Sequence, residues 1–192
     1  MSQAIFYFDL GSPFAYLTAV RLDAHLPEPV VWRPVLLGGI FKLNGRSSWA
    51  LGGAEQRREG IAEIERRAGE YGLPPLRWPD RWPSDYLFAM RVATFAFQIE
   101  RGRAFTMRAF RAAFQEGRDL SVPEQALEAA AEVGIDPDIA TEAAADPTVK
   151  AALRAATDAA HERGVFGVPT VAIGDELFWG DDRLQDAAAR LG

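Results

Sequence analysis

The most informative absence in this sequence of 192 residues is cysteine, which does not occur at all. Without cysteine, the chain cannot carry a disulfide framework, a thiolate metal site or a redox cycle that uses its own thiols. Any thiol chemistry in this protein therefore needs a thiol from another molecule.

Histidine and long apolar runs are also scarce. The two histidines, His25 and His161, fall near the ends of expected helices and belong to no HxxxH or carboxylate–histidine cluster, so we expect no metal site. No run approaches the ~18 apolar residues of a membrane span, and the N-terminus lacks the charged and apolar regions of a signal peptide. We therefore expect a cytoplasmic protein without a membrane partner.

The charge balance is acidic, with a formal net charge of −6. A protein that binds nucleic acid by neutralising phosphates needs a concentrated basic face, so we expect no nucleic-acid partner. The arginines between Arg101 and Arg118 alternate with apolar residues at helical spacing and are interpreted as a solvated helix face. The hydrophobic content of 48% is ordinary for a globular protein with one sizeable core.

The order of the apolar segments predicts an α/β fold. Residues 5–10 and 30–37 have strand character, and a helix begun at Pro13 lies between them. Residues 54–164 form a series of helical segments, and residues 170–192 return to two strands and a helix. This order is the plan of a thioredoxin-like fold with a large all-helical domain inserted between its β-α-β and β-β-α halves.

We therefore divide the chain into a thioredoxin-like domain of residues 1–37 and 165–192 and an inserted helical domain of residues 54–164. Residues 38–53 are rich in Gly and Ser and are expected to form a long connecting loop at the active site.

Two boundaries near the ends of the chain follow from local signals. The first helix is expected to continue to Leu26 and to stop at Pro27. The last two strands are expected to join through a turn at Asp175 and Glu176.

The step from Ser12 to Pro13 has two interpretations. Ser is a preferred N-cap and Pro suits the first helical position, so the pair explains a helix start on its own. The loop between a strand and a helix is also where α/β proteins bind ligands. A serine-hydrolase role is disfavoured, because the motif is not G-x-S-x-G and His25 would lie roughly 20 Å away along the same helix.

Two more segments have both a structural and a functional interpretation. Val168–Pro169 precedes a strand and is a candidate cis peptide, which would offer the Val168 backbone to an extended ligand, although a trans turn stays open. Asp182 has capping-box spacing to Gln185, and the pair Asp181 and Asp182 could instead hold a ligand amine.

Three motifs together resemble one family. They are FYFDLGSPFAYL (6–17), RPVLLGGIFK (33–42) and GVFGVPTVAIGDELFWGDDRL (164–184). In these motifs the chain resembles the 2-hydroxychromene-2-carboxylate isomerases. That family is related to the kappa-class glutathione transferases and belongs to the DsbA-like thioredoxin superfamily. The resemblance implies a homodimeric isomerase of aromatic catabolism with glutathione as its cofactor.

The resemblance also implies roles for particular residues. Ser12 would donate its hydroxyl hydrogen bond to the glutathione sulfur and, with the helix N-terminus, favour the thiolate. Val168 beside Pro169 would pair with the glutathione backbone. Asp181 and Asp182 would bind the γ-glutamyl end, and Asn44 would match an asparagine in the family's loop.

The chain departs from the family pattern in the part that would bind the substrate. The family has a lysine after its loop asparagine, where this chain offers Arg57 or Arg58, and an asparagine where this chain has Asp85 and Tyr86. A kappa-type glutathione transferase, which would release a conjugate, is therefore an alternative. A non-catalytic thioredoxin-fold binding module, in which Ser12 is only a cap, is another, and the lack of cysteine opposes a disulfide oxidoreductase.

Overall fold

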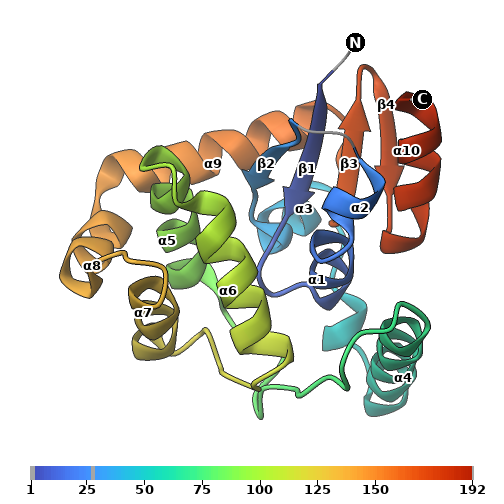
Figure 1. The fold of residues 1–192 in the computed structure, drawn as a ribbon, viewed down its shortest axis with the longest axis horizontal. Coiled ribbons are helices and arrows are strands. Elements are labelled where there is room, and N and C mark those ends of the chain that lie inside the picture. Colours follow the sequence, from blue (N-terminus) through green and yellow to red (C-terminus); the bar gives the residue numbers. More distant parts are fainter. Residues whose placement is uncertain (1–2, 27–28, 192) are drawn as a thin grey trace.

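The computed structural model describes residues 3–26 and 29–191. Within these residues, four strands form one mixed sheet in the order β2-β1-β3-β4 (Figure 1). The strands are β1 (Ala4–Phe8), β2 (Val31–Pro34), β3 (Thr170–Ile173) and β4 (Glu176–Trp179). β1 pairs in parallel with β2 and antiparallel with β3, and β3 pairs antiparallel with β4. The thioredoxin-like plan predicted from the sequence is confirmed.

The helices occupy the connections between these strands and the end of the chain. In chain order they are α1 (Pro13–Ala19), α2 (Leu22–His25), α3 (Leu37–Leu43), η1 (Trp49–Leu51), α4 (Ala54–Glu70), α5 (Leu87–Gln98), α6 (Gly102–Phe114), α7 (Pro123–Ala131), α8 (Pro137–Ala145), α9 (Pro147–Glu162), η2 (Asp181–Arg183) and α10 (Leu184–Leu191). Helices α5 to α8 gather beside the sheet, and α4 lies below it in the view of Figure 1. No helix in the described part of the chain is long and apolar enough to span a bilayer.

Both faces of the sheet are covered, which explains why the first strand is apolar on both sides. Phe6 and Phe8 of β1 are buried in the main core with Trp32, at ring distances of 5.0 and 5.9 Å. Tyr7 points to the other face and belongs to a smaller core with Ile40 of α3. Successive side chains of β1 thus point alternately into two cores, one on each face of the sheet. The sheet is packed between two layers of helices.

The first helix is shorter than expected. It ends at Ala19, and a separate turn of helix, α2, begins at Leu22. Arg21 lies at the break, and its side chain donates a hydrogen bond to the backbone oxygen of Asp181 at 3.2 Å. The helix therefore breaks where Arg21 contacts a residue near the far end of the chain. The spacing of apolar residues within the helix could not predict this contact. The expected stop at Pro27 lies outside the described residues.

The prediction of a loop over residues 38–53 is wrong in its first half, where α3 forms. The carboxylate of Asp9 accepts the backbone N–H of Leu37 at 2.8 Å and so stabilises the start of this helix. Gly39 allows close packing, because a Cβ there would lie 3.2 Å from the Thr157 side chain of α9. Tertiary contacts here outweigh the low helix propensity of glycine.

Two further boundaries differ from the predictions. Ile173 pairs with Glu176, so the turn between β3 and β4 consists of Gly174 and Asp175. The last helix begins at Leu184, so Asp182 lies in the short helix η2 before it rather than at its N-cap.

Candidate active site

A cavity of about 1060 Å³ lies where β1 leads into α1. Its walls come from segments that are far apart in the sequence, so only the folded chain forms it. The lining residues in these segments are Asp9, residues 11–14, residues 36–39 and 41, residues 48–51, Arg67, residues 82–87 and 90, residues 167–169 and residues 179–183.

The cavity brings together five of the residues that the sequence singled out: Ser12, Val168, Pro169, Asp181 and Asp182. The Val168–Pro169 peptide bond is cis, which was one of the two interpretations of this step. The cavity therefore joins the first helix start to the two segments near the end of the chain.

Asn44 is not among the described residues that line the cavity. It follows α3, where its amide donates to the backbone oxygen of Ile40 at 2.8 Å and lies 3.4 Å from Nδ1 of His161. Arg57 and Arg58 are not among the lining residues either. Arg57 instead donates to the backbone oxygen of Trp82, which is itself a lining residue.

Ser12 is the N-cap of α1, as its sequence context predicts. It is 5% exposed, and its Oγ accepts the backbone N–H of Ala15 at 3.2 Å. A serine hydroxyl can donate one hydrogen bond in addition to those that it accepts. Since the described residues supply no acceptor for this proton, the capping hydroxyl keeps a donor for a ligand in the cavity.

Asp9 is a buried carboxylate in the cavity wall, and the sequence analysis missed it. Its two carboxylate oxygens accept the N–H groups of Gly11 and Leu37, each at 2.8 Å. Burial raises the pKa of Asp9, the two backbone hydrogen bonds oppose this rise, and the charge of Asp85 adds to it. The sequence signal was an acidic residue in an otherwise apolar stretch directly before the Gly11-Ser12 turn.

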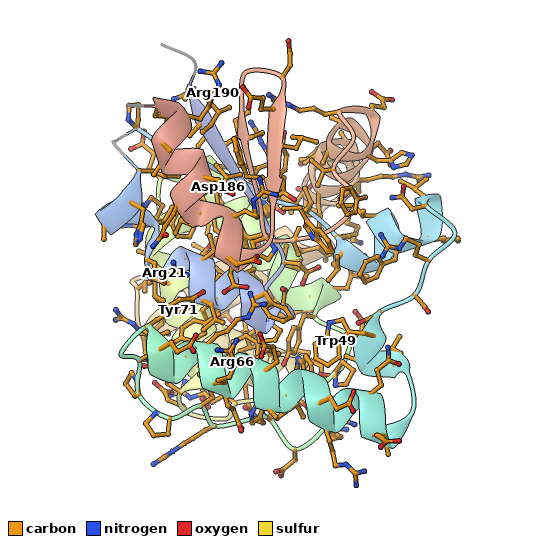
Figure 2. The ribbon with its side chains drawn as sticks, turned by 90° about the vertical axis from the view of Figure 1, so that its right-hand side faces the viewer. Arg21, Trp49, Arg66, Tyr71, Asp186 and Arg190 are labelled. Carbon is orange, nitrogen blue, oxygen red and sulfur yellow. The ribbon has the colours of Figure 1, made fainter. Side chains whose placement is uncertain are left out.

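Aromatic side chains form much of the wall near Ser12. Trp82 donates from its indole nitrogen to the backbone oxygen of Gly11 at 3.1 Å, and its ring centre lies 5.7 Å from that of Trp49. Phe14 lies 6.3 Å from Trp49, which Figure 2 shows beside α4. The Trp82–Pro83 bond is also cis, which the sequence analysis did not predict. Such a wall suits a flat apolar ligand.

Charged side chains line the cavity around Asp181. Its carboxylate accepts hydrogen bonds from Nη1 of Arg67 at 2.7 Å and from the hydroxyl of Tyr71 at 2.8 Å. Burial raises the pKa of Asp181, while the contacts with Tyr71 and Arg67 lower it. Tyr71 lies at the end of α4, and the guanidinium of Arg21 covers its ring at 3.5 Å (Figure 2). The site thus combines a hydroxyl donor, an aromatic wall and a charged end.

A cavity at the start of the first helix, beside a cis-proline segment and on this sheet, defines a protein of the thioredoxin class. The family model of DSBA-like thioredoxin domains matches residues 3–192. The chain therefore belongs to the family of DsbA-like thioredoxin domains.

Two proteins that are similar to this chain over most of its length carry the same name. The chain is 31% identical over 189 residues to the 2-hydroxychromene-2-carboxylate isomerase of Sphingobium xenophagum, over 93% of this chain and 92% of that protein. It is 27% identical to the protein of the same name from Pseudomonas putida, over 97% and 93% of the two chains. The family resemblance of the three sequence motifs is thereby confirmed.

Solved structures agree with this placement. A 2-hydroxychromene-2-carboxylate isomerase superposes with a TM-score of 0.82 at 26% identity, over 98% of this chain and 95% of the other. A probable DsbA oxidoreductase from Streptomyces coelicolor has the same fold, with a TM-score of 0.80 at 21% identity over 99% and 89% of the two chains.

Proposed function

We propose that this protein is a glutathione-dependent cis-trans isomerase that acts on an aromatic-catabolism intermediate of the 2-hydroxychromene-2-carboxylate type. The names of the relatives support an isomerase of this type. The observation that carries the glutathione dependence is the free hydroxyl donor of Ser12 in a cavity of a chain without cysteine.

The chemistry of the cavity wall fits glutathione. Ser12 offers an O–H donor for a sulfur anion, and Val168 lies in the same wall, where its backbone can pair with an extended peptide. Three further lining residues, Arg67, Asp181 and Asp182, offer charges of both signs for the charged end of glutathione.

Glutathione, when bound, would supply a thiolate that adds reversibly to an unsaturated carbon, so that the former double bond can rotate before elimination restores it. The role of Ser12 is to lower the pKa of the thiol, because a hydrogen bond to an ionised sulfur is stronger than one to the neutral group. Helix α1 has seven residues, so we assign this effect to the hydroxyl rather than to the helix. The rings of Trp49 and Trp82 would hold a flat substrate and exclude water beside Ser12.

The test is an assay of the purified protein with 2-hydroxychromene-2-carboxylate, with and without glutathione, in which substrate and glutathione are both quantified. We expect turnover only with glutathione and an unchanged amount of glutathione at the end. Loss of glutathione with formation of a conjugate would identify the alternative, a kappa-type transferase. Absence of glutathione binding at millimolar concentration would contradict both functions.

A further inference from the structure

The positively charged groups of the cavity are confined to one part of its wall. Two arginines are among the described lining residues, and both lie with Asp181: Arg67 is 2.7 Å from its carboxylate, and Arg183 follows it in η2. Arg183 also pairs with Asp186. Each guanidinium charge is therefore already offset by a carboxylate of the protein.

The part of the wall that adjoins Ser12 is different, because residues 82–90 contribute aromatic and acidic side chains to the lining and no basic one. A Cβ at Gly11 would lie 2.9 Å from the ring of Tyr86, so this ring packs against the turn before Ser12. Asp85 directly precedes Tyr86 and also lines the cavity. A substrate that touches a sulfur atom held by Ser12 therefore lies close to a segment with a carboxylate and no cation.

Asp85 carries a negative charge that no cation of the described residues offsets. One of its carboxylate oxygens accepts the backbone N–H of Leu87 at 2.9 Å, and no basic side chain in the described part of the chain pairs with it. Its charge acts on Asp9: burial is the main cause of the raised pKa of Asp9, and the charge of Asp85 adds to it. The field of Asp85 thus reaches the start of the turn that leads to Ser12.

An anionic group on a substrate would be repelled in this part of the cavity. It would meet the charge of Asp85 and that of the sulfur anion, and like charges repel more strongly in a cavity than in bulk water because the effective dielectric constant is lower. Arg57 offers no compensation, since it donates to the backbone oxygen of Trp82 and is not a lining residue. An uncharged aromatic compound avoids this repulsion and still packs against the rings of Trp49 and Trp82.

The proposed chemistry does not need a carboxylate on the substrate. When the thiolate forms a C–S bond, the electron pair of the double bond moves onto the oxygen of a conjugated carbonyl group, and elimination returns it. A ketone, an ester or an amide can accept this electron pair without any negative charge on the free substrate.

We propose that the preferred substrate of this protein is an uncharged α,β-unsaturated carbonyl compound with an aromatic ring, and that Asp85 is the residue that selects against a carboxylate on it. This inference rests on the proposed function and narrows its substrate class. A carboxylate substrate is still isomerised, but less efficiently.

The test compares two substrates that differ only in charge, 2-hydroxychromene-2-carboxylate and 2-hydroxychromene-2-carboxamide, at saturating glutathione. The measured quantity is the ratio of kcat/KM for the carboxamide to kcat/KM for the carboxylate. We expect a ratio of about ten for the wild-type protein, as for one screened contact between like charges.

Asp85→Asn removes the charge and keeps an oxygen that can accept the N–H of Leu87, so the start of α5 should be retained. Its ratio should fall to about one. Asp80→Asn is the matched control, because it removes the same charge from an exposed side chain that is near in sequence and is not among the lining residues. It should keep the wild-type ratio, and a Tm measurement shows that each variant is folded.

A wild-type ratio of one or less would overturn this inference and leave the glutathione-dependent isomerase intact. A ratio that stays near ten in Asp85→Asn, or that falls equally in Asp80→Asn, would overturn the role of Asp85. Absence of glutathione-dependent turnover of both substrates would instead overturn the proposed function.

Discussion

At the scale of single residues, Ser12 shows how one hydroxyl serves both a helix and a ligand. It accepts the N–H group of Ala15 in the first turn of α1, while its proton has no acceptor in the described part of the protein. Ser12 can therefore be the N-cap of α1 and a ligand donor at the same time. The two interpretations that the sequence left open do not exclude each other. The cap contributes to the free energy of unfolding, whereas the donor would affect the pKa of a bound thiol and the turnover, so the two roles can be measured separately.

Substitution Ser12→Ala removes both roles. The lost cap should lower the free energy of unfolding by about 1 kcal/mol. The lost donor should raise the pKa of the bound glutathione thiol and reduce turnover by roughly tenfold or more, which the ultraviolet absorbance of the thiolate and steady-state kinetics measure.

The matched control is Asp136→Ala, which removes the N-cap of α8. We expect a similar loss of stability and an unchanged thiol pKa. If Ser12→Ala loses stability like this control but keeps thiol pKa and turnover, Ser12 is only a cap.

Asp9 makes stability depend on pH. Its pKa is raised in the folded state chiefly by burial, so the folded protein binds a proton that the unfolded chain has released. Relative to Asp9→Asn, wild-type stability should be highest below about pH 4, the ordinary value for Asp, and should fall as pH rises through the folded pKa.

Urea unfolding of both proteins between about pH 4 and pH 7 measures this difference, with a slope of at most about 1.4 kcal/mol per pH unit for one proton. Asn cannot accept both N–H groups that Asp9 binds, so a constant offset between the proteins is expected as well. A stability difference between the two proteins that does not change with pH would contradict a raised pKa of Asp9 in the folded state.

At the scale of elements, α4 shows how one helix supports the cavity. Its residue Gly60 faces Trp49 so closely that a Cβ would lie 2.1 Å from the indole ring. The absence of a side chain at this position lets Trp49 stand against Trp82 and Phe14 in the wall. The glycine thus links the sequence of α4 to the shape of the site.

Substitution Gly60→Ala should therefore lower the free energy of unfolding by about 1–3 kcal/mol, because the overpacking outweighs the better helix propensity of Ala. Chemical denaturation measures the change, and the quenching of Trp fluorescence by an aromatic ligand should weaken.

Gly69→Ala in the same helix is the control, since a Cβ there meets no atom within 4 Å. It should stabilise the protein by about 0.5–1 kcal/mol. Equal effects of the two substitutions would show that Gly60 does not constrain Trp49.

At the scale of the whole molecule, the first and last parts of the chain and the inserted helices each supply one wall of the cavity. The only thiol available to the proposed reaction comes from outside, because the chain has no cysteine. The expected homodimer and cytoplasmic location stay predictions, and light scattering of the purified protein measures the first.

The lack of cysteine also predicts the effect of a thiol-blocking reagent. Treatment of the protein with iodoacetamide, followed by removal of the reagent, should leave the glutathione-dependent activity unchanged. Glutathione alkylated beforehand should support no turnover in the same assay. Turnover with the alkylated cofactor would exclude a role for its thiol.

The sequence by itself determined the order of strands and helices, the cap at Ser12 and the absence of any thiol of the chain's own. These features depend on apolar periodicity, on the residues next to a helix start and on composition, all of which are local or additive. They were enough to identify the plan of the fold and most of the candidate residues.

Only the tertiary structure decided which groups meet. The start of α3 depends on a contact between Leu37 and Asp9, and the charged side of the cavity depends on Arg67 and Asp181, which are 114 positions apart. Such pairings follow from how the sheet and helices pack, and no local pattern encodes them. The fold thereby commits Asp181 to Arg67 and Tyr71, places Asn44 away from the cavity wall and leaves Asp182 open.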